Sequence, residues 1–363
     1  MQLSFAPTVD GDEIQRRLEL LLVPGPLLDA PLSLRIDRLA RSFAGYAASY
    51  PLPLWAPGLV IDNEMRSLTE ALLPMAEIRP LFERLLKKGC RFSPLLSGCY
   101  LHSSASWIDF LQRLHPPLPL ANPAATLSRL AEDFEARRRF LFSLMLPHHY
   151  GGGFDRYPLQ SQWLSGWLKE RAGSFIRGIR VLDSACGSGE GTYQVAELLQ
   201  EAGYSGRSCE VHGSTLEEIE LFAAAHLYFP HDPQREREYR ARTAPLLSAA
   251  DPPRLEFYLD RVGSVPQREP YHLVLCNGLL GGPLLHDEAG LDAAFAGLAA
   301  RLLPGGVLLA ADRFHAGWRL RVPAERLKEL MQAHGLTPIE VPEGIAGKKE
   351  AVLVQYPKGV ARG

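Results

Sequence analysis

The second half of the chain alternates short apolar runs with amphipathic segments, and this alternation limits the fold more than any other feature of the sequence. From residue 179 onward, the apolar runs are bounded by Gly, Ser or Asp and are separated by segments with helical periodicity. Such alternation is typical of a parallel sheet whose connecting helices cover both faces. We expect strands at 179–184, 208–213, 254–259, 271–276, 306–312, 337–341 and 351–356.

The last two expected strands are joined only by the short loop VPEGIAGKKE. A connection this short pairs its strands antiparallel, so we expect a hairpin at the edge of an otherwise parallel sheet. The predicted fold class is therefore α/β, with a Rossmann-like sheet of seven strands that is parallel apart from a terminal antiparallel hairpin.

The first part of the chain has a different pattern. Across residues 1–123, apolar residues recur at three- and four-residue steps without strand-like alternation. In 13–22 and 80–88, leucines form one stripe and charged residues the opposite face, as in amphipathic helices. A longer helix is expected from Asn122, as its N-cap, to about Met145. This part of the chain is therefore predicted to be an α-helical domain.

Three consecutive glycines in HHYGGGFDRYP (148–158) interrupt the helical pattern, and Pro158 begins a new helix. Glycine permits backbone conformations that other residues avoid, so a run of it marks a break between elements. We place the domain boundary here. Residues 1–150 are predicted to form the helical N-terminal domain and residues 151–363 the sheet domain.

The stretch IRVLDSACGSGEGTYQVAELL (179–199) says most about function. An apolar strand ends at Asp183, a turn containing Gly187, Gly189 and Gly191 follows, and a helix then begins. Glycines let a ligand approach the backbone, and the N–H groups at a helix start favour carboxylate or phosphate oxygens. Parallel sheets bind ligands at the carboxyl ends of their strands, so we interpret this turn as a nucleotide-type site; the alternative is a purely structural turn.

The GxGxG spacing after an acidic strand end differs from the GxGxxG of dinucleotide-binding folds. VLDSACGSGEGT resembles motif I of the class I S-adenosylmethionine (AdoMet) methyltransferases, whose fold is also a seven-stranded sheet with a terminal hairpin. A closer resemblance, to the chemotaxis receptor methyltransferases (the CheR family), is carried by FDRYPLQSQWLSGWL, DSACGSGEGTYQVAELL, HGSTLEEIELFAAAHLYFP and LVLCNGLLGGP. It implies an AdoMet-dependent methyltransferase acting on a protein carboxylate; an NAD-dependent oxidoreductase is the alternative enzyme class.

The same resemblance assigns cofactor contacts residue by residue. It implies that Asp183 lies near the methionine ammonium and that Arg156 and Glu190 contact the methionine part. It also implies that Asp260 accepts a hydrogen bond from the adenine amino group. Asn277 stands within the pair of positions where the family has Arg-Asn. The cofactor-binding set implied is Arg156, Asp183, Ala185, Gly187, Gly189, Glu190, Ser214, Asp260 and Asn277.

Three departures from the family pattern affect these assignments. Where the family has an acid for the ribose hydroxyls, this chain has Ser214, which offers only a neutral hydrogen bond. Either Glu217 replaces that acid or cofactor affinity is low. The aromatic residue expected after the fourth strand is replaced by glycines and a proline at 281–283. Residues 231–253 are too few for an accessory β-subdomain that docks chemoreceptor tails.

The sequence leaves the methyl acceptor open, and no catalytic residue is assigned. A carboxylate acceptor needs no general base, and Arg156 could hold it. A hydroxyl or amine acceptor needs a base, for which His286, His315, Tyr150 and Asp312 are the candidates. The alternatives are thus a small-molecule O- or N-methyltransferase and, because of the neutral ribose position, a non-catalytic AdoMet-binding regulator.

Charge and composition exclude several other classes of protein. Lys and Arg number 39 against 41 Asp and Glu, for a net charge of -2, so binding of nucleic acid through bulk charge is not expected. The arginine run 137–139 is interpreted as the solvated face of a helix.

The cysteine pattern and the apolar runs bear on location. Five cysteines fit neither a disulfide framework nor a metal-binding pair, so a reducing compartment and no metal are expected. The segment MQLSFAPTVDGDEIQ lacks the features of a secretory signal, and no apolar run is long enough to span a membrane. We therefore expect a cytoplasmic protein that does not bind membranes. Its oligomeric state is left open.

Overall fold

The computed structural model describes residues 3–49, 60–114, 121–146, 153–171, 173, 175, 178–311 and 316–350. Two compact units emerge. The sheet unit comprises Met1–Ser4, Gly153–Leu216 and Leu246–Gly363, and the helical unit comprises Phe5–Gly152 and Glu217–Pro245. Residues 217–245, expected in the sheet domain, thus group with the helical unit. The division into a helical domain of residues 1–150 and a cofactor-binding sheet domain of residues 151–363 stays a prediction.

The α/β class and the terminal antiparallel hairpin are confirmed. The sheet has eight strands in the order β1-β4-β3-β2-β5-β6-β8-β7, with parallel pairing from β4 to β6 and antiparallel pairing of β8 with β6 and β7. It exceeds the expected seven by β1, a short strand at the edge beside β4. The strands are β1 Ser4–Phe5, β2 Ile179–Ser184, β3 Cys209–Thr215, β4 Arg254–Leu259, β5 Tyr271–Leu275, β6 Leu302–Ala311, β7 Leu336–Ile339 and β8 Gly344–Lys349.

The hairpin lies earlier in the chain than expected. Its second strand is β8, formed by residues assigned to the connecting loop, whereas the expected strand 351–356 lies outside the described residues. The glycines of this stretch permit close strand pairing. A Cβ on Gly344 would lie 2.2 Å from the Ala310 carbonyl oxygen, and one on Gly347 would lie 3.0 Å from the Leu336 Cβ.

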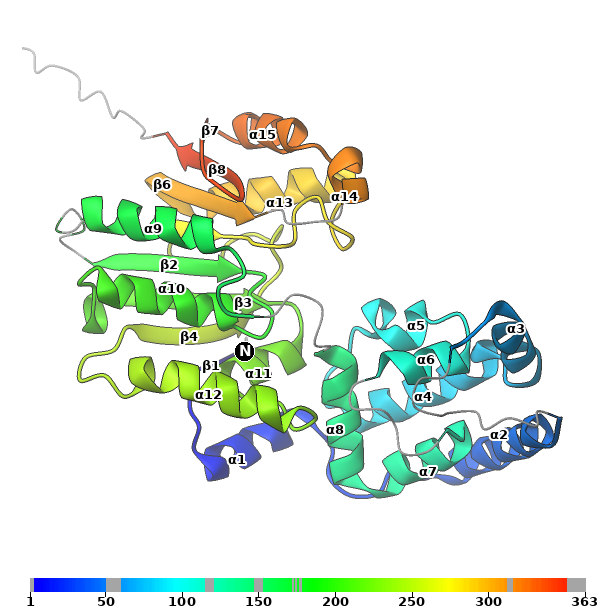
Figure 1. Cartoon of the computed structure of the whole chain (residues 1–363). Helices are drawn as coiled ribbons and strands as arrows, with labels where there is room; N and C mark the ends of the chain where they lie inside the picture. Colours follow the sequence, from blue (N-terminus) through cyan, green and yellow to red (C-terminus); the bar gives the residue numbers. More distant parts are fainter. Residues whose placement is uncertain are drawn as a thin grey trace, which may run out of the picture. The chain divides into compact units, whose positions relative to one another are not determined.

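Helices of the sheet unit cover both faces of the sheet (Figure 1). On one face, Leu182, Val274 and Leu308 share a buried cluster with residues of α13 and α15. On the other, Tyr193 of α10 packs on Phe257 of β4, with ring centroids 5.5 Å apart. The helices are α9 Pro158–Glu170, α10 Glu190–Glu201, α13 Glu288–Ala300, α14 Ala316–Arg321 and α15 Ala324–Ala333, with a 3-10 turn at Gly206–Ser208.

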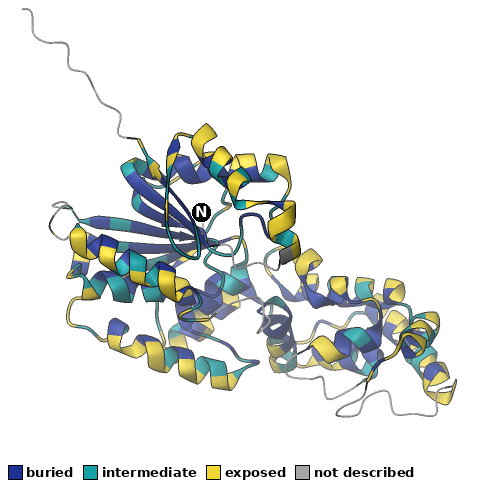
Figure 2. Ribbon diagram, turned by 45° about the horizontal axis from the view of Figure 1, so that its top comes forward, coloured by how far each residue is buried: buried dark blue, intermediate teal, exposed yellow. Residues whose placement is uncertain are grey.

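Burial follows this layered arrangement. The strands are largely buried, whereas the helices of the sheet unit alternate buried and exposed positions (Figure 2). Such a pattern matches the near-continuous apolar runs from which the strands were expected. In the part of the chain that the structure describes, no helix is both long and apolar enough to cross a bilayer.

The helical unit confirms the helices expected near 13–22 and 80–88, and the helix beginning after Asn122. The Asn122 side chain accepts hydrogen bonds from Ala124 N and Ala125 N. The unit contains α1 Gly11–Leu21, α2 Ala30–Ser49, α3 Asn63–Leu72, α4 Met75–Gly89, α5 Tyr100–Ser103, α6 Trp107–Arg113, α7 Pro123–Glu132, α8 Phe134–Met145, α11 Glu218–His226 and most of α12 Pro233–Leu247, with a 3-10 turn at Leu96–Gly98.

The single helix expected from Asn122 to about Met145 is wrong, because Asp133 divides it. Asp133 has an extended backbone, ends α7 and caps α8 by accepting a hydrogen bond from Ala136 N at 3.1 Å. Aspartate is a strong N-cap residue, and the apolar periodicity that continues across it does not reveal the break.

The expectation that the arginine run 137–139 is solvated is also wrong for Arg137. Arg137 is only 3% exposed, and its guanidinium donates to the carbonyl oxygens of Leu130, Val23 and Gly25 at 2.8–2.9 Å. It therefore holds the chain entering α2 against the end of α7. Arg139 is exposed, as expected.

We predict that Arg137→Met lowers the free energy of unfolding by about 2–4 kcal/mol, because one buried and two half-buried carbonyl oxygens lose their donor. The measurement is urea denaturation followed by circular dichroism. Arg139→Met, two positions along the same helix, is the matched control and should change stability by less than about 0.5 kcal/mol. Equal effects of the two substitutions would contradict the structural role given to Arg137.

Candidate functional site

The candidate site lies where the direction of chain progression through the sheet reverses. Strand β2 pairs with β3 on one side and with β5 on the other. The chain runs from β2 through β3 to β4 toward one edge of the sheet, and then crosses back to β5 on the other side of β2. Open parallel sheets form a ligand crevice at this switch point, outside the carboxyl ends of the strands. The glycine turn follows β2 directly, and α10 begins at Glu190.

The turn is held in a conformation that few residues adopt. Ala185, Gly187 and Gly189 have φ values of 62°, 55° and 88°. Ala185 is the notable member, because an alanine in the left-handed region is strained and such strain is commonly found at functional sites. Cys186 N donates to the Ser214 carbonyl oxygen at 2.9 Å, which ties the turn to the end of β3.

Two carboxyl groups are buried at this turn. Asp183, at 6% exposure, accepts a hydrogen bond from the Thr192 hydroxyl at 2.7 Å, and burial raises its pKa to about 6 against the opposing effect of Thr192. Glu190, at 5% exposure, accepts a hydrogen bond from the Ser188 hydroxyl at 2.7 Å. Glu190 is the first residue of α10, where the helix dipole favours a negative charge.

The ends of β3 and β4 continue the site. Ser214 is buried near the end of β3, and the next residue, Thr215, accepts a backbone hydrogen bond from Asp260 at 2.9 Å. Asp260 therefore lies directly after β4 and beside the end of β3. Glu217, the alternative ribose acid, is the first residue of the segment that groups with the helical unit. Burial and the nearby Glu220 and Glu218 raise its pKa to about 8.

Arg156 and Asn277 lie near the end of β5. The Asn277 side-chain nitrogen donates to Gln160 Oε1 at 2.9 Å, and the side-chain oxygen Oδ1 of Asn277 accepts from Ala311 N at 2.7 Å. Asn277 therefore links the ends of β5 and β6 to α9. Gly278 follows with φ 74°, and a Cβ there would lie 3.2 Å from Arg156 Nη1. The glycine thus leaves room for the arginine.

The structure brings the expected binding residues together at the carboxyl ends of the parallel strands. The turn residues adjoin Ser214 through Cys186, Ser214 adjoins Asp260 through Thr215, and Arg156 lies against the residue after Asn277. Thr192, Gln160 and Arg301 contact these residues but were not predicted from the sequence. Thr192 lies in the first turn of the helix after the glycines, and this closeness in sequence to Asp183 is a local signal for their hydrogen bond. Arg301 is 41 residues from its partner Asp260 and carries no comparable signal.

The candidate bases are only partly described. Tyr150, Asp312 and His315 lie outside the described residues. His286 lies between β5 and α13, with its ring 4.9 Å from that of Trp318 in α14. Its Nδ1 is buried and makes no hydrogen bond to a described residue. Within the described ranges, no group of three or more His, Cys, Asp or Glu side chains could hold a metal ion.

No protein-family model matches the sequence, and no curated protein matches it. Some solved structures share part of the fold. An O-methyltransferase family protein from Burkholderia thailandensis is 17% identical with a TM-score of 0.34; the match covers 62% of this chain and 63% of that one, less than two thirds of its length.

Two other solved structures match most of their own length. The N-methyltransferase NodS from Bradyrhizobium japonicum WM9 is 14% identical, with a TM-score of 0.35, over 54% of this chain and 99% of that chain. A TehB-like SAM-dependent methyltransferase from Corynebacterium glutamicum is 16% identical, with a TM-score of 0.30. The match covers 53% of this chain and 97% of that chain. All these identities and TM-scores are low, so the similarity is partial.

The raised pKa of Asp183 predicts a specific pH dependence of stability. A carboxyl whose pKa rises from 3.8 to about 6 on folding holds its proton more tightly in the folded state. The unfolding free energy of the wild type should therefore fall, relative to that of Asp183→Asn, by about 2–3 kcal/mol between pH 4 and pH 7. Urea denaturation across this pH range measures the difference.

The control for this prediction is Asp12→Asn, which changes an exposed carboxyl in α1. Its difference from the wild type should stay nearly flat over the same pH range. A flat difference for Asp183→Asn as well would mean that the Asp183 carboxyl keeps its ordinary pKa in the folded protein.

Proposed function

We propose that this protein is an AdoMet-dependent methyltransferase whose cofactor binds at the glycine turn and the adjoining strand ends. The observation that carries the proposal is the pair of buried carboxyl groups, Asp183 and Glu190, at that turn. Two carboxyl groups at one turn complement the positive charge of a ligand that is cationic at its amino-acid end. AdoMet has an ammonium and a sulfonium there.

The same carboxyl groups argue against a dinucleotide. A pyrophosphate on this turn would bring negative charges close to Asp183, which is largely ionised at neutral pH, and to Glu190. Two unit charges about 4 Å apart interact by about 4 kcal/mol at a partly buried site, and here the sign is repulsive. An ammonium in the same place gains a similar energy, so a cationic ligand is strongly favoured over NAD.

The cofactor supplies an electrophilic methyl group, and the residues of this chain bind and orient it. We assign Asp183 to the ammonium, and the backbone of Ala185, Gly187 and Gly189 to the length of the amino-acid tail. Arg156, beside Gly278, is suited to the cofactor carboxylate. Ser214 supplies a neutral hydroxyl near the ribose, and we keep Glu217 as the alternative acid.

Methyl transfer from a sulfonium is an in-line displacement in which a positive charge is lost. An enzyme for this reaction chiefly aligns the acceptor with the methyl group and excludes water. A rigid turn suits this task, because the hydrogen bonds from Cys186 N to the Ser214 carbonyl oxygen and from Gly189 N to the Cys186 carbonyl oxygen fix its geometry. No metal is required by the proposal.

A small-molecule hydroxyl or amine is the acceptor that we favour over a receptor carboxylate. Residues 233–247 form the helix α12, so the described part of the 231–253 segment contains no accessory β-subdomain. His286 offers a base of the kind that a hydroxyl or amine requires, because it follows β5 and its Nδ1 has no hydrogen-bond partner among the described residues.

Cofactor identity is tested by calorimetric titration with S-adenosylhomocysteine (AdoHcy) and with NADH. We expect the wild type to bind AdoHcy and not NADH, with affinity weakening below about pH 6 as Asp183 becomes protonated. Asp183→Asn should lower AdoHcy affinity at least about tenfold through loss of a charge-assisted hydrogen bond. Glu201→Gln, at the exposed far end of α10, is the control. Binding of NADH without AdoHcy would refute the proposal.

The acceptor class is tested by transfer of a tritiated methyl group from AdoMet to a cell lysate, followed by fractionation and base treatment. We expect label in the small-molecule fraction that survives base. His286→Gln should lower kcat about 100-fold while leaving AdoHcy affinity unchanged, and the control His334→Gln should do neither. Base-labile label on protein would instead favour a carboxylate acceptor, and AdoHcy binding without any transfer would favour a regulator.

A further inference from the structure

The connection between β4 and β5 is unusual for a parallel sheet. It must pass β3 and β2, yet residues 260–270 contain no helix. Parallel crossovers usually need a dozen or more residues and a helix, which satisfies its own backbone hydrogen bonds. A coil in this place needs other partners for its carbonyl oxygens.

The coil packs tightly on α13. A Cβ on Gly297 would lie 2.2 Å from the Val262 carbonyl oxygen, and a Cβ on Gly263 would lie 3.2 Å from the backbone of Ala293. Glycine on both sides of the contact permits this approach. The segment Asp260–Ser264 is therefore held directly against the helix instead of being separated from it by side chains.

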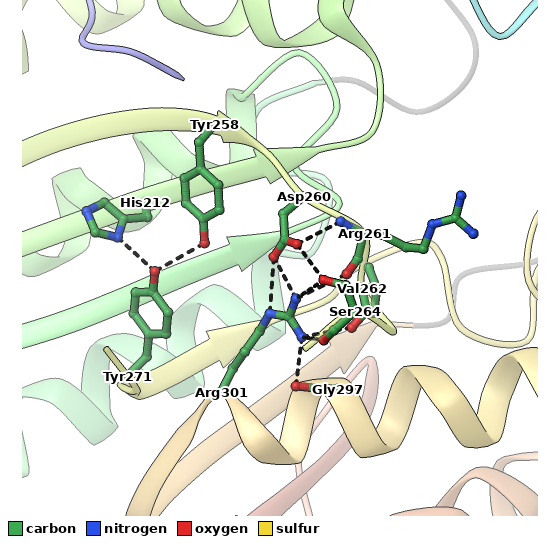
Figure 3. Close-up of polar contacts among 9 residues, drawn as sticks. All are labelled: His212, Tyr258, Asp260, Arg261, Val262, Ser264, Tyr271, Gly297 and Arg301. Carbon is green, nitrogen blue, oxygen red and sulfur yellow. Dashed lines mark hydrogen bonds and ion pairs between the residues drawn. The ribbon is translucent and has the colours of Figure 1, made fainter. Parts of the chain in front are cut away.

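Arg301, which ends α13, supplies the missing donors (Figure 3). Its guanidinium donates to the carbonyl oxygens of Arg261, Val262 and Ser264 at 3.0–3.1 Å. It also donates to the Ser264 hydroxyl at 3.0 Å and to the Asp260 carboxylate at 2.6 Å and 3.2 Å. The Arg301 side chain is 2% exposed and that of Asp260 is 15% exposed, so the guanidinium itself is almost completely withdrawn from water.

The Asp260 carboxylate is fully engaged in this network. One oxygen accepts from Arg261 N and the Ser264 hydroxyl, both at 2.8 Å, and the other accepts twice from Arg301. A carboxylate offers about four lone-pair directions, and four donors use them. An adenine amino group would have to displace one of these four donors, two of which belong to the buried Arg301 guanidinium.

We infer that Arg301 and Asp260 form a positioning pair: together they fix the conformation of Asp260–Ser264, and this segment, not the Asp260 carboxylate itself, forms the adenine end of the cofactor site. The inference rests on the proposed function. Asp260 N donates a hydrogen bond to the Thr215 carbonyl oxygen, so the conformation of Asp260–Ser264 is tied to the ribose end of the site at β3.

The test compares two ligands, AdoHcy and its analogue lacking the 6-amino group, on the full chain by calorimetry. A positioning role predicts that Arg301→Lys and Asp260→Asn each weaken both ligands by the same factor, about tenfold, with the stoichiometry unchanged. A merely destabilised protein would instead bind with unchanged affinity and a reduced stoichiometry. Lysine keeps the charge but cannot reach several carbonyl oxygens at once, so it isolates the multidentate role of Arg301.

The matched control is Arg268→Met. Arg268 lies in the same β4–β5 connection and pairs with Glu256 at 2.8–2.9 Å, but it does not contact the Asp260 carboxylate in the described structure. We expect its affinity for either ligand to stay within about twofold of the wild type, well below the loss expected from the positioning pair.

Three results would overturn the inference. If Asp260→Asn weakens AdoHcy but not the analogue, Asp260 contacts the adenine amino group directly. If Arg301→Lys and Asp260→Asn leave both affinities unchanged, the pair does not position the site. If they change only stoichiometry, their role is structural. A wild type that binds neither ligand would refute the proposed function itself, a result that the comparison among variants cannot mimic.

Discussion

The burial of the Asp183 carboxyl is the constraint on which the site depends. A carboxylate removed from water is costly unless donors or a cation compensate it, and the Thr192 hydroxyl supplies only one neutral donor. The raised pKa of Asp183 expresses this incomplete compensation. The turn next to it leaves backbone amides and a second carboxyl, Glu190, at the same edge. The protein thus maintains a site whose electrostatic cost falls when a cationic group binds.

The strands that carry this site could be predicted from the sequence because they are buried and parallel. The expected bounds of 179–184 and 254–259 match β2 and β4, since fully buried strands give apolar runs with polar residues at their ends. The hairpin was expected correctly in kind but misplaced. Gly344 and Gly347 resemble loop residues in sequence, and their reason for being in a strand, close contact with β6 and β7, is visible only in three dimensions.

Long-range polar contacts explain what the sequence could not predict. Arg137 and Arg301 are both buried, and both donate to several backbone carbonyl oxygens of segments that lack regular hydrogen bonding. In sequence each is simply a charged residue in or at the end of a helix, for which solvent exposure is the ordinary expectation. The carbonyl groups that they satisfy lie up to 114 residues away, and no local pattern encodes such a partner. Each unit of the protein therefore contains an arginine that replaces missing secondary structure.

The same network changes how charge is distributed along the strand ends. Arg301 neutralises Asp260 at the end of β4, and Ser214 is neutral near the end of β3, so the ends of these strands present little net charge in the proposed ribose and adenine regions. Negative charge is concentrated at Asp183 and Glu190. A ribose acid at position 214 would add a third carboxylate near these two, raising the cost of the unliganded state as well as the attraction for a cation. With serine there, recognition of the proposed cofactor depends more heavily on its amino-acid end, while shape and backbone contacts decide which base is accepted. Rigid control of Asp260–Ser264 by Arg301 then matters more, because no strong charge-assisted bond at that end can compensate for a misplaced segment.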